Sequence, residues 1–161
     1  MTHAILVKEL ARTGVQIPEL GLGMWQYHSL QYAVKAAGSF QSHRGANWVQ
    51  QGNAAAQIKD AAQVLADNVP GVAPSRITVV FKATNTITSA SQTVTCTLNN
   101  CLTNTTAWPP TNYNSPGFDV EINASFNFNS GISMVAPGPG PASVSFGSYQ
   151  FPGYTKQFIL F

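Results

Sequence analysis

The front third of the chain carries apolar residues at helical intervals. Four of them stand three or four positions apart and so share one helix face: Tyr27, Leu30, Val34 and Ala37. Polar residues, including Gln26 and Lys35, fall outside this face. The pattern predicts an amphipathic helix that begins near Pro18, a residue tolerated in a first helical turn, and weakens between Gly38 and Gly45. We expect the four apolar residues to form a packing and assembly face.

A second helical pattern lies in NAAAQIKDAAQVLADNVPG, residues 53–71. Its apolar stripe consists of Ala54, Ile58, Ala61 and Leu65. Asn53 is the expected N-cap, because an asparagine side chain can accept hydrogen bonds from the free N–H groups of a first turn. The segment from Asn68 to Gly71, which includes a proline, ends the helix.

From Arg76 onward the period of the apolar residues falls to two, which predicts strands. The three clearest runs are Ile77, Val79 and Phe81; then Val94, Cys96 and Leu98; then Phe118, Val120, Ile122, Ala124, Phe126 and Phe128. A weaker fourth strand is expected in ASVSF, with Val144 and Phe146, and the tail KQFILF is compatible with a short edge strand. Connections rich in Pro, Gly, Asn and Thr separate the runs.

Helices followed by strands are the element order of an α+β fold. We therefore predict an N-terminal helix, with a second alanine-rich helix, packed on an antiparallel β-meander of about four strands. A chain of 161 residues is long enough for one such domain with its own core.

The residue composition is that of an exported protein. Charged residues make up 9% of the chain, against about 25% in an average soluble domain. An uncharged polar surface is typical of exported and extracellular β-rich proteins. The net charge of +2 is scattered along the whole length, so no basic stripe could follow a phosphate backbone, and we expect no nucleic-acid partner.

Both cysteines lie in the piece TVTCTLNNC. Two strands meeting at an Asn99-Asn100 turn would bring Cys96 and Cys101 to bonding distance, and such a disulfide persists in an oxidising compartment. A pair of free thiols remains the alternative. A metal site is disfavoured, because no histidine or further cysteine stands nearby to complete four ligands.

No constellation of catalytic residues is visible, and no enzymatic activity, cofactor or small-molecule substrate is expected. The serines lack a G-x-S-x-G setting. His28 and His43 lack the short-range spacing of metal ligands. We expect both to be surface or half-buried histidines that make ordinary hydrogen bonds. Asp119 and Glu121 alternate with apolar residues and therefore mark the solvent side of a strand.

The sequence contains no export device. No segment reaches the ~20 consecutive apolar residues of a membrane helix. The apolar run at the front, Ala4 to Val7, ends at Lys8 and is too short for a signal peptide. This contrasts with the exported composition.

The run ELGLGMWQYHSLQYAVKAAGSFQSHRG resembles the segment after the membrane anchor of TadE-like proteins, pseudopilin-like components of bacterial tight-adherence (Tad/Flp) pilus machines. The matching positions are Glu19 and Gly21, Met24 to His28, and then Leu30, Ala33, Val34, Ala36, Ala37 and Gly38. The similarity extends over roughly residues 19 to 155, through the alanine-rich helix, the cysteine strand and DVEINASFNF.

The resemblance implies a pilin-like fold and a non-catalytic minor pilin or pseudopilin. Its partners would be other pilins or pilus-assembly proteins, and it would be held at the periplasmic or cell-surface side of a bacterial inner membrane by an anchor. In place of that anchor the chain has MTHAILVKELARTGVQIP. Residues 1–18 are thus an atypical N-terminal segment and residues 19–161 a single domain. The anchor is either removed, lost to a misplaced start site, or truly absent in a soluble variant.

A secreted β-rich adhesin or carbohydrate-binding module is the alternative. In this hypothesis the long turn TNTTAWPPTNYNSPG holds a ligand through the aromatic residues Trp108 and Tyr113. A non-catalytic phage or capsid structural protein is a third, weaker alternative.

Overall fold

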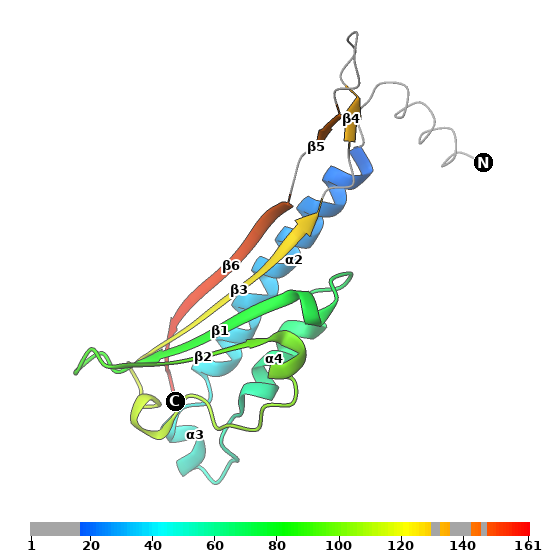
Figure 1. Ribbon diagram of the computed structural model, residues 1–161. Helices are drawn as coiled ribbons and strands as arrows, with labels where there is room; N and C mark the ends of the chain where they lie inside the picture. Colours follow the sequence, from blue (N-terminus) through cyan, green and yellow to red (C-terminus); the bar gives the residue numbers. More distant parts are fainter. Residues whose placement is uncertain (1–16, 130–132, 136–142, 146–147) are drawn as a thin grey trace.

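The computed structural model describes residues 17–129, 133–135, 143–145 and 148–161 (Figure 1). Its helices are α2 (Ile17–Ser42), α3 (Ala46–Gln50), α4 (Ile58–Asp67) and α5 (Leu98–Cys101), with 3₁₀ turns η1 (Pro74–Arg76) and η2 (Thr111–Tyr113). Its strands are β1 (Ile77–Thr84), β2 (Ser91–Thr97), β3 (Asp119–Asn129), β4 (Ser133–Val135), β5 (Ser143–Ser145) and β6 (Ser148–Phe158). The predicted α+β class is confirmed. Of the segment 1–18, only Ile17 and Pro18 are described, and they begin α2.

The main sheet has four antiparallel strands in the order β2-β1-β3-β6. This is not the order of a meander, because β3 lies on the far side of β1 from β2. Burial explains the order: Val120, Ile122 and Ala124 of β3 are fully buried, as a central strand requires, whereas β2 is mostly exposed. Between the two strands the chain leaves the sheet and contacts the start of α4, where Ile58 N–H donates to the Thr106 carbonyl.

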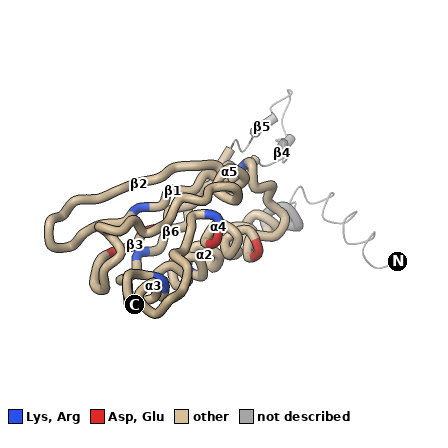
Figure 2. The backbone as a smooth tube through the Cα atoms, turned by 90° about the horizontal axis from the view of Figure 1, so that it is seen from below, with Lys and Arg blue, Asp and Glu red and all other residues tan. Residues whose placement is uncertain are grey.

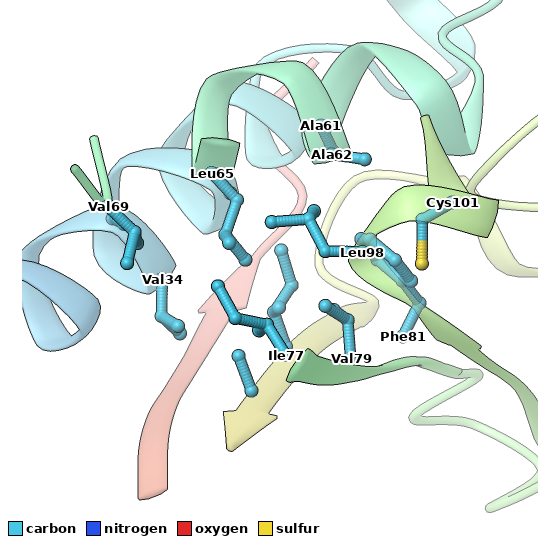
Figure 3. Packing of buried hydrophobic residues seen from close by; sticks show 14 of the residues in the cluster. Val34, Ala61, Ala62, Leu65, Val69, Ile77, Val79, Phe81, Leu98 and Cys101 are labelled. Carbon is cyan, nitrogen blue, oxygen red and sulfur yellow. The ribbon is translucent and has the colours of Figure 1, made fainter. Parts of the chain in front are cut away.

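The core lies between one face of this sheet and the helices α2 and α4. Figure 1 shows α2 running lengthwise behind β3 and β6. In Figure 3, Val34 of α2 and Leu65 of α4 point toward Ile77, Val79 and Phe81 of β1. All five are fully buried. The helical and strand periodicities read from the sequence therefore meet in one apolar layer.

The helix α4 begins later than the sequence suggests. It starts at Ile58, where Gln57 and Asp60 form a reciprocal capping box, so the predicted N-cap at Asn53 is wrong. The Asn53 side chain instead donates to the carbonyl of Trp48, at the end of the unpredicted helix α3. The predicted end at Asn68 is confirmed.

The fourth strand of the main sheet is β6, not ASVSF. Within ASVSF, Ser143–Ser145 forms β5, which pairs with β4 in a separate two-stranded ribbon, while Phe146 lies outside the described residues. The strand β6 is longer than the short edge expected from the tail, and it contains Pro152 and Gly153. An edge strand tolerates a proline where its missing N–H faces away from the neighbouring strand.

The disulfide between Cys96 and Cys101 is confirmed, with an S–S distance of 2.04 Å. The local structure differs from the two strands expected to meet at Asn99-Asn100. Leu98–Cys101 forms the short helix α5, which Thr97 caps by accepting from the Asn100 N–H. Leu98 and Cys101 point into the core (Figure 3), so the disulfide joins the end of β2 to the buried layer.

Candidate functional site

The predicted packing face of α2 is occupied within the chain itself. Leu30, Val34 and Ala37 are fully buried. Tyr27 is half-buried, and its ring meets Phe151 of β6 edge-on at 5.6 Å between centroids. All four hold the helix on the sheet, and the three fully buried ones are not available for contacts with other molecules. The packing part of the expectation thus agrees with the structure, and any assembly surface must lie elsewhere.

The same helix exposes a second set of apolar residues. We call Leu22, Met24, Trp25 and Tyr32 the outer strip; their exposed fractions are 47%, 55%, 46% and 65%. Trp25 and Tyr32 lie seven positions apart with exposed His28 between them, so the three share the side of α2 opposite the buried stripe. Between Gly21 and Ser42, Lys35 is the single Lys, Arg, Asp or Glu of this helix.

The sequence pattern shows that α2 is rich in aromatic residues, but it does not show which of them are buried and which are exposed. Tyr27 locks the helix on the sheet, whereas Trp25 and Tyr32 face solvent. The spacing of Trp25, His28 and Tyr32 is itself a signal for a second face.

A pocket of about 250 Å³ adjoins the outer strip, between α2 and the end of β3. Leu22, Val72, Phe126 and Phe128 give it an apolar lining, and Gln26 and Arg76 lie at its polar side. The Gln26 side chain donates to the Gly71 carbonyl at 3.1 Å, and Arg76 donates to the Asn127 carbonyl at 2.6 Å. These donors therefore already serve to hold the η1 segment on α2 and β3.

The open face of the sheet carries an ion-pair cluster. Lys156 lies 2.7 Å from Asp119, Lys82 lies 3.2 Å from Glu121, and the Tyr154 hydroxyl donates to Glu121 at 3.1 Å. The acids lie on the predicted side of β3, but their side chains are only 8% and 16% exposed. The two acids therefore mark the open face of the sheet, as predicted, but cross-strand lysines cover them.

The cluster shifts the titration of two of its members. The hydrogen bond from Lys156 to Asp119, helped by the attraction between the two charges, raises the pKa of the Lys156 ammonium. Desolvation, followed by the hydrogen bond to Glu121, raises the pKa of the Tyr154 hydroxyl. Both shifts favour the protonated forms at neutral pH.

The aromatic residues of the long turn do not form an exposed ligand site. Trp108 is 1% exposed, and its ring packs edge-on against Phe81 at 6.4 Å. The backbone N–H of Trp108 donates to the Ala56 carbonyl at 2.8 Å, which ties the turn to the segment before α4. Tyr113 is half-buried against the same core. Trp108 is therefore not a solvent-facing residue, whereas Tyr113 keeps part of its surface exposed.

Among the described residues, no group of three His, Cys, Asp or Glu side chains could hold a metal ion. His28 and His43 are both exposed, and the Nδ1 atom of His43 lies 2.7 Å from the Ser39 carbonyl. In the part of the chain that the structure describes, the helices are too short or too polar to cross a membrane.

Comparisons of the chain with protein-family models, with curated proteins and with solved structures find no match.

Proposed function

We propose that this chain is a non-catalytic minor pilin-like or pseudopilin-like subunit of a tight-adherence pilus machine, related to the TadE-like proteins. The observation that carries the proposal is the two-sided character of α2. One face is buried in the domain through Leu30 and Val34, and the opposite face exposes Trp25 and Tyr32 to solvent.

An exposed apolar strip on a nearly uncharged helix is suited to burial against another helix. Subunits of a helical filament associate in this way, by packing helix faces against one another. The outer strip would accordingly contact the apolar helix faces of other pilins or of pilus-assembly proteins. A long helix laid across a four-stranded antiparallel sheet is also the arrangement that the sequence resemblance implies.

The disulfide supports a location on the periplasmic or cell-surface side of a bacterial inner membrane. Disulfides persist in the periplasm and are reduced in the cytosol. Attachment to the membrane through an anchor belongs to the same proposal.

A surface variant of α2 tests the function. Replacing Trp25 and Tyr32 together by serine should leave the fold unchanged, because neither side chain belongs to the buried core. In the host bacterium the variant should lose piliation and co-purification with the pilins. Lys35→Gln, an exposed change on the same helix, is the control and should retain both.

Normal piliation in the Trp25/Tyr32 variant would refute the proposal. Circular dichroism and thermal unfolding of the purified variant show that a loss of piliation does not come from misfolding.

A further inference from the structure

The two edges of the main sheet differ in how well they are protected. The edge at β6 contains Pro152, which has no N–H to offer, and the Pro152 carbonyl accepts from the Gln31 side chain of α2 at 2.7 Å. Lys156 adds a charge to the same strand. Proline and lysine are common devices against the pairing of an edge with another chain.

The edge at β2 has none of these devices. Its seven residues, SQTVTCT, include no charge and no proline, and it pairs with β1 without a bulge. In Figure 2, β2 lies along the outer margin of the molecule and carries neither blue nor red. The helix α5, which follows β2 directly, turns toward the helix layer through buried Leu98 and Cys101.

The hydrogen-bond pattern shows which backbone groups of β2 are unused. The Asn85 N–H donates to the Ala90 carbonyl at 2.9 Å. Hydrogen-bonded and non-hydrogen-bonded pairs alternate along an antiparallel ladder, and Asn85 and Ala90 form a hydrogen-bonded pair. In the observed register, the backbone N–H and C=O groups of four β2 residues therefore point away from β1. They are Ser91, Thr93, Thr95 and Thr97.

The same alternation, carried across β1 and β3, places Pro152 in a pair without hydrogen bonds to β3. A proline, which has no N–H, fits only such a pair. Its position therefore supports the assignment of the outward-pointing residues in β2. Among the described residues, no hydrogen bond beyond the β1 ladder reaches the backbone of residues 91–96, whereas the Thr97 carbonyl accepts the first hydrogen bond of α5.

We propose that the β2 edge binds the β2 edge of a second copy of this chain, antiparallel, in a register centred on Val94. This register sets Thr93 opposite the partner's Thr95, Ser91 opposite the partner's Thr97, and Val94 opposite the partner's Val94. The outward N–H and C=O groups of Thr93 and Thr95 in one copy then face those of the other, and the two sheets join into one of eight strands.

The strand is complementary to itself, which argues for a second copy over a foreign segment. An uncharged edge brings no like charges together when it pairs with itself. Facing threonines and serines form favourable cross-strand pairs on the open face, and the Val94 pair extends the half-buried face. The centred register also keeps the helices of both copies on the same side of the joined sheet.

This contact is separate from the proposed filament contact. A two-fold axis at β2 makes the α2 helices of the two copies antiparallel, whereas a filament packs its helices in one direction. The β2 contact also uses no residue of the outer strip, so either contact can fail without the other.

The oligomeric state of the purified full chain tests the proposal. Light scattering after gel filtration, at about 100 μM, should give twice the 17.2 kDa mass of the chain. Hydrogen exchange should show the Thr93 and Thr95 amides slowed by at least about tenfold, although neither has an acceptor among the residues that the structure describes.

Charge substitutions in β2 test the register. Thr93→Lys with Thr95→Lys places like charges opposite each other across the axis and should yield a monomer. Thr93→Lys with Thr95→Glu places opposite charges there and should restore the dimer. Thr78→Lys, at an exposed position on the same face of β1, is the control and should leave the dimer intact.

A proline variant tests the backbone contact independently. Thr95→Pro removes an outward N–H and leaves the β1 ladder intact, so it should dissociate the dimer while circular dichroism stays unchanged. A monomeric wild-type chain with fast exchange at Thr93 and Thr95 would overturn the proposal. A dimer insensitive to both the double-lysine and the proline changes would also overturn it.

Discussion

Gly38 of α2 and Thr155 of β6 approach so closely that no side chain fits between them. A Cβ atom built on Gly38 would lie 2.5 Å from Cγ2 of Thr155. About one and two turns earlier in α2, Val34 and Leu30 lie against Gly153 of β6, where a Cβ would meet their side chains at 3.0 Å and 3.1 Å. Where α2 crosses β6, a glycine on one element thus faces a larger residue on the other, which allows the two backbones to lie close together.

Replacing Gly38 by leucine should therefore push α2 away from β6. We expect a loss of about 1–3 kcal/mol in the free energy of unfolding, as for other overpacked cores. Gly21→Ala in the same helix is the matched control, because a Cβ there has no neighbour within 4 Å. It should leave stability unchanged or raise it by up to about 1 kcal/mol. Urea unfolding measures both, and equal stability of the two variants would contradict the close packing.

The disulfide between Cys96 and Cys101 closes a loop with a sequence separation of 5. Restricting so short a loop in the unfolded chain is worth about 2 kcal/mol in the chain-entropy description. Reduction, or replacement of both cysteines by alanine, should lower the free energy of unfolding by about that amount. Denaturant curves with and without reductant measure the loss. The alanine variant should not respond to reductant, and a wild-type protein indifferent to reductant would show that the disulfide adds no stability.

The sequence predicts the elements whose periodicity is strong. β1 and β3 alternate without interruption, and α2 carries its buried stripe at regular helical intervals, so the sequence identifies these elements. The sequence indicates β6 only in its last residues, because Pro152 and Gly153 break the alternation. The segment is a strand because its backbone pairs with β3. This pairing joins residues far apart in the sequence, so the local sequence pattern does not reveal it.

The errors in the candidate sites have the same origin. Trp108 lies in a turn rich in Pro and Asn, which favours exposure, yet its backbone N–H donates to the Ala56 carbonyl, about fifty residues earlier in the chain. Likewise, the apolar spacing of α2 identifies the buried Leu30 and Val34, but it cannot show that Tyr32 remains uncovered. Whether an apolar residue is exposed depends on which segment covers it.

Trp108 and Trp25 give opposite predictions for the same substitution. Trp108→Ala removes a buried ring that packs on Phe81, and it should cost about 3–5 kcal/mol of stability. Trp25→Ala removes a ring that is 46% exposed and should cost less than about 1 kcal/mol. Thermal and denaturant unfolding distinguish them. A Trp108→Ala variant with native stability and a lost ligand-binding activity would restore the carbohydrate-binding hypothesis.

The ion-pair cluster on the open sheet face predicts a loss of stability at alkaline pH. The pKa values of Lys156 and Tyr154 are raised in the folded state. A raised folded pKa means that the folded protein holds the proton more tightly than the unfolded chain does. The stabilisation is therefore complete below the unfolded pKa values and is lost as pH rises through the folded ones. We expect the decline above about pH 10, where unperturbed tyrosine and lysine titrate.

Lys156→Met isolates the contribution of the lysine. Below about pH 9 the variant should be less stable than the wild type, because Asp119 loses its partner and remains buried. The difference should shrink steadily as pH rises toward about 11, where the wild-type lysine also loses its charge. Urea unfolding at a series of pH values measures this difference. Lys35→Met, at an exposed position on α2, is the control and should show no such trend. A difference that stays constant across the alkaline range would mean that the Lys156 charge does not stabilise the fold.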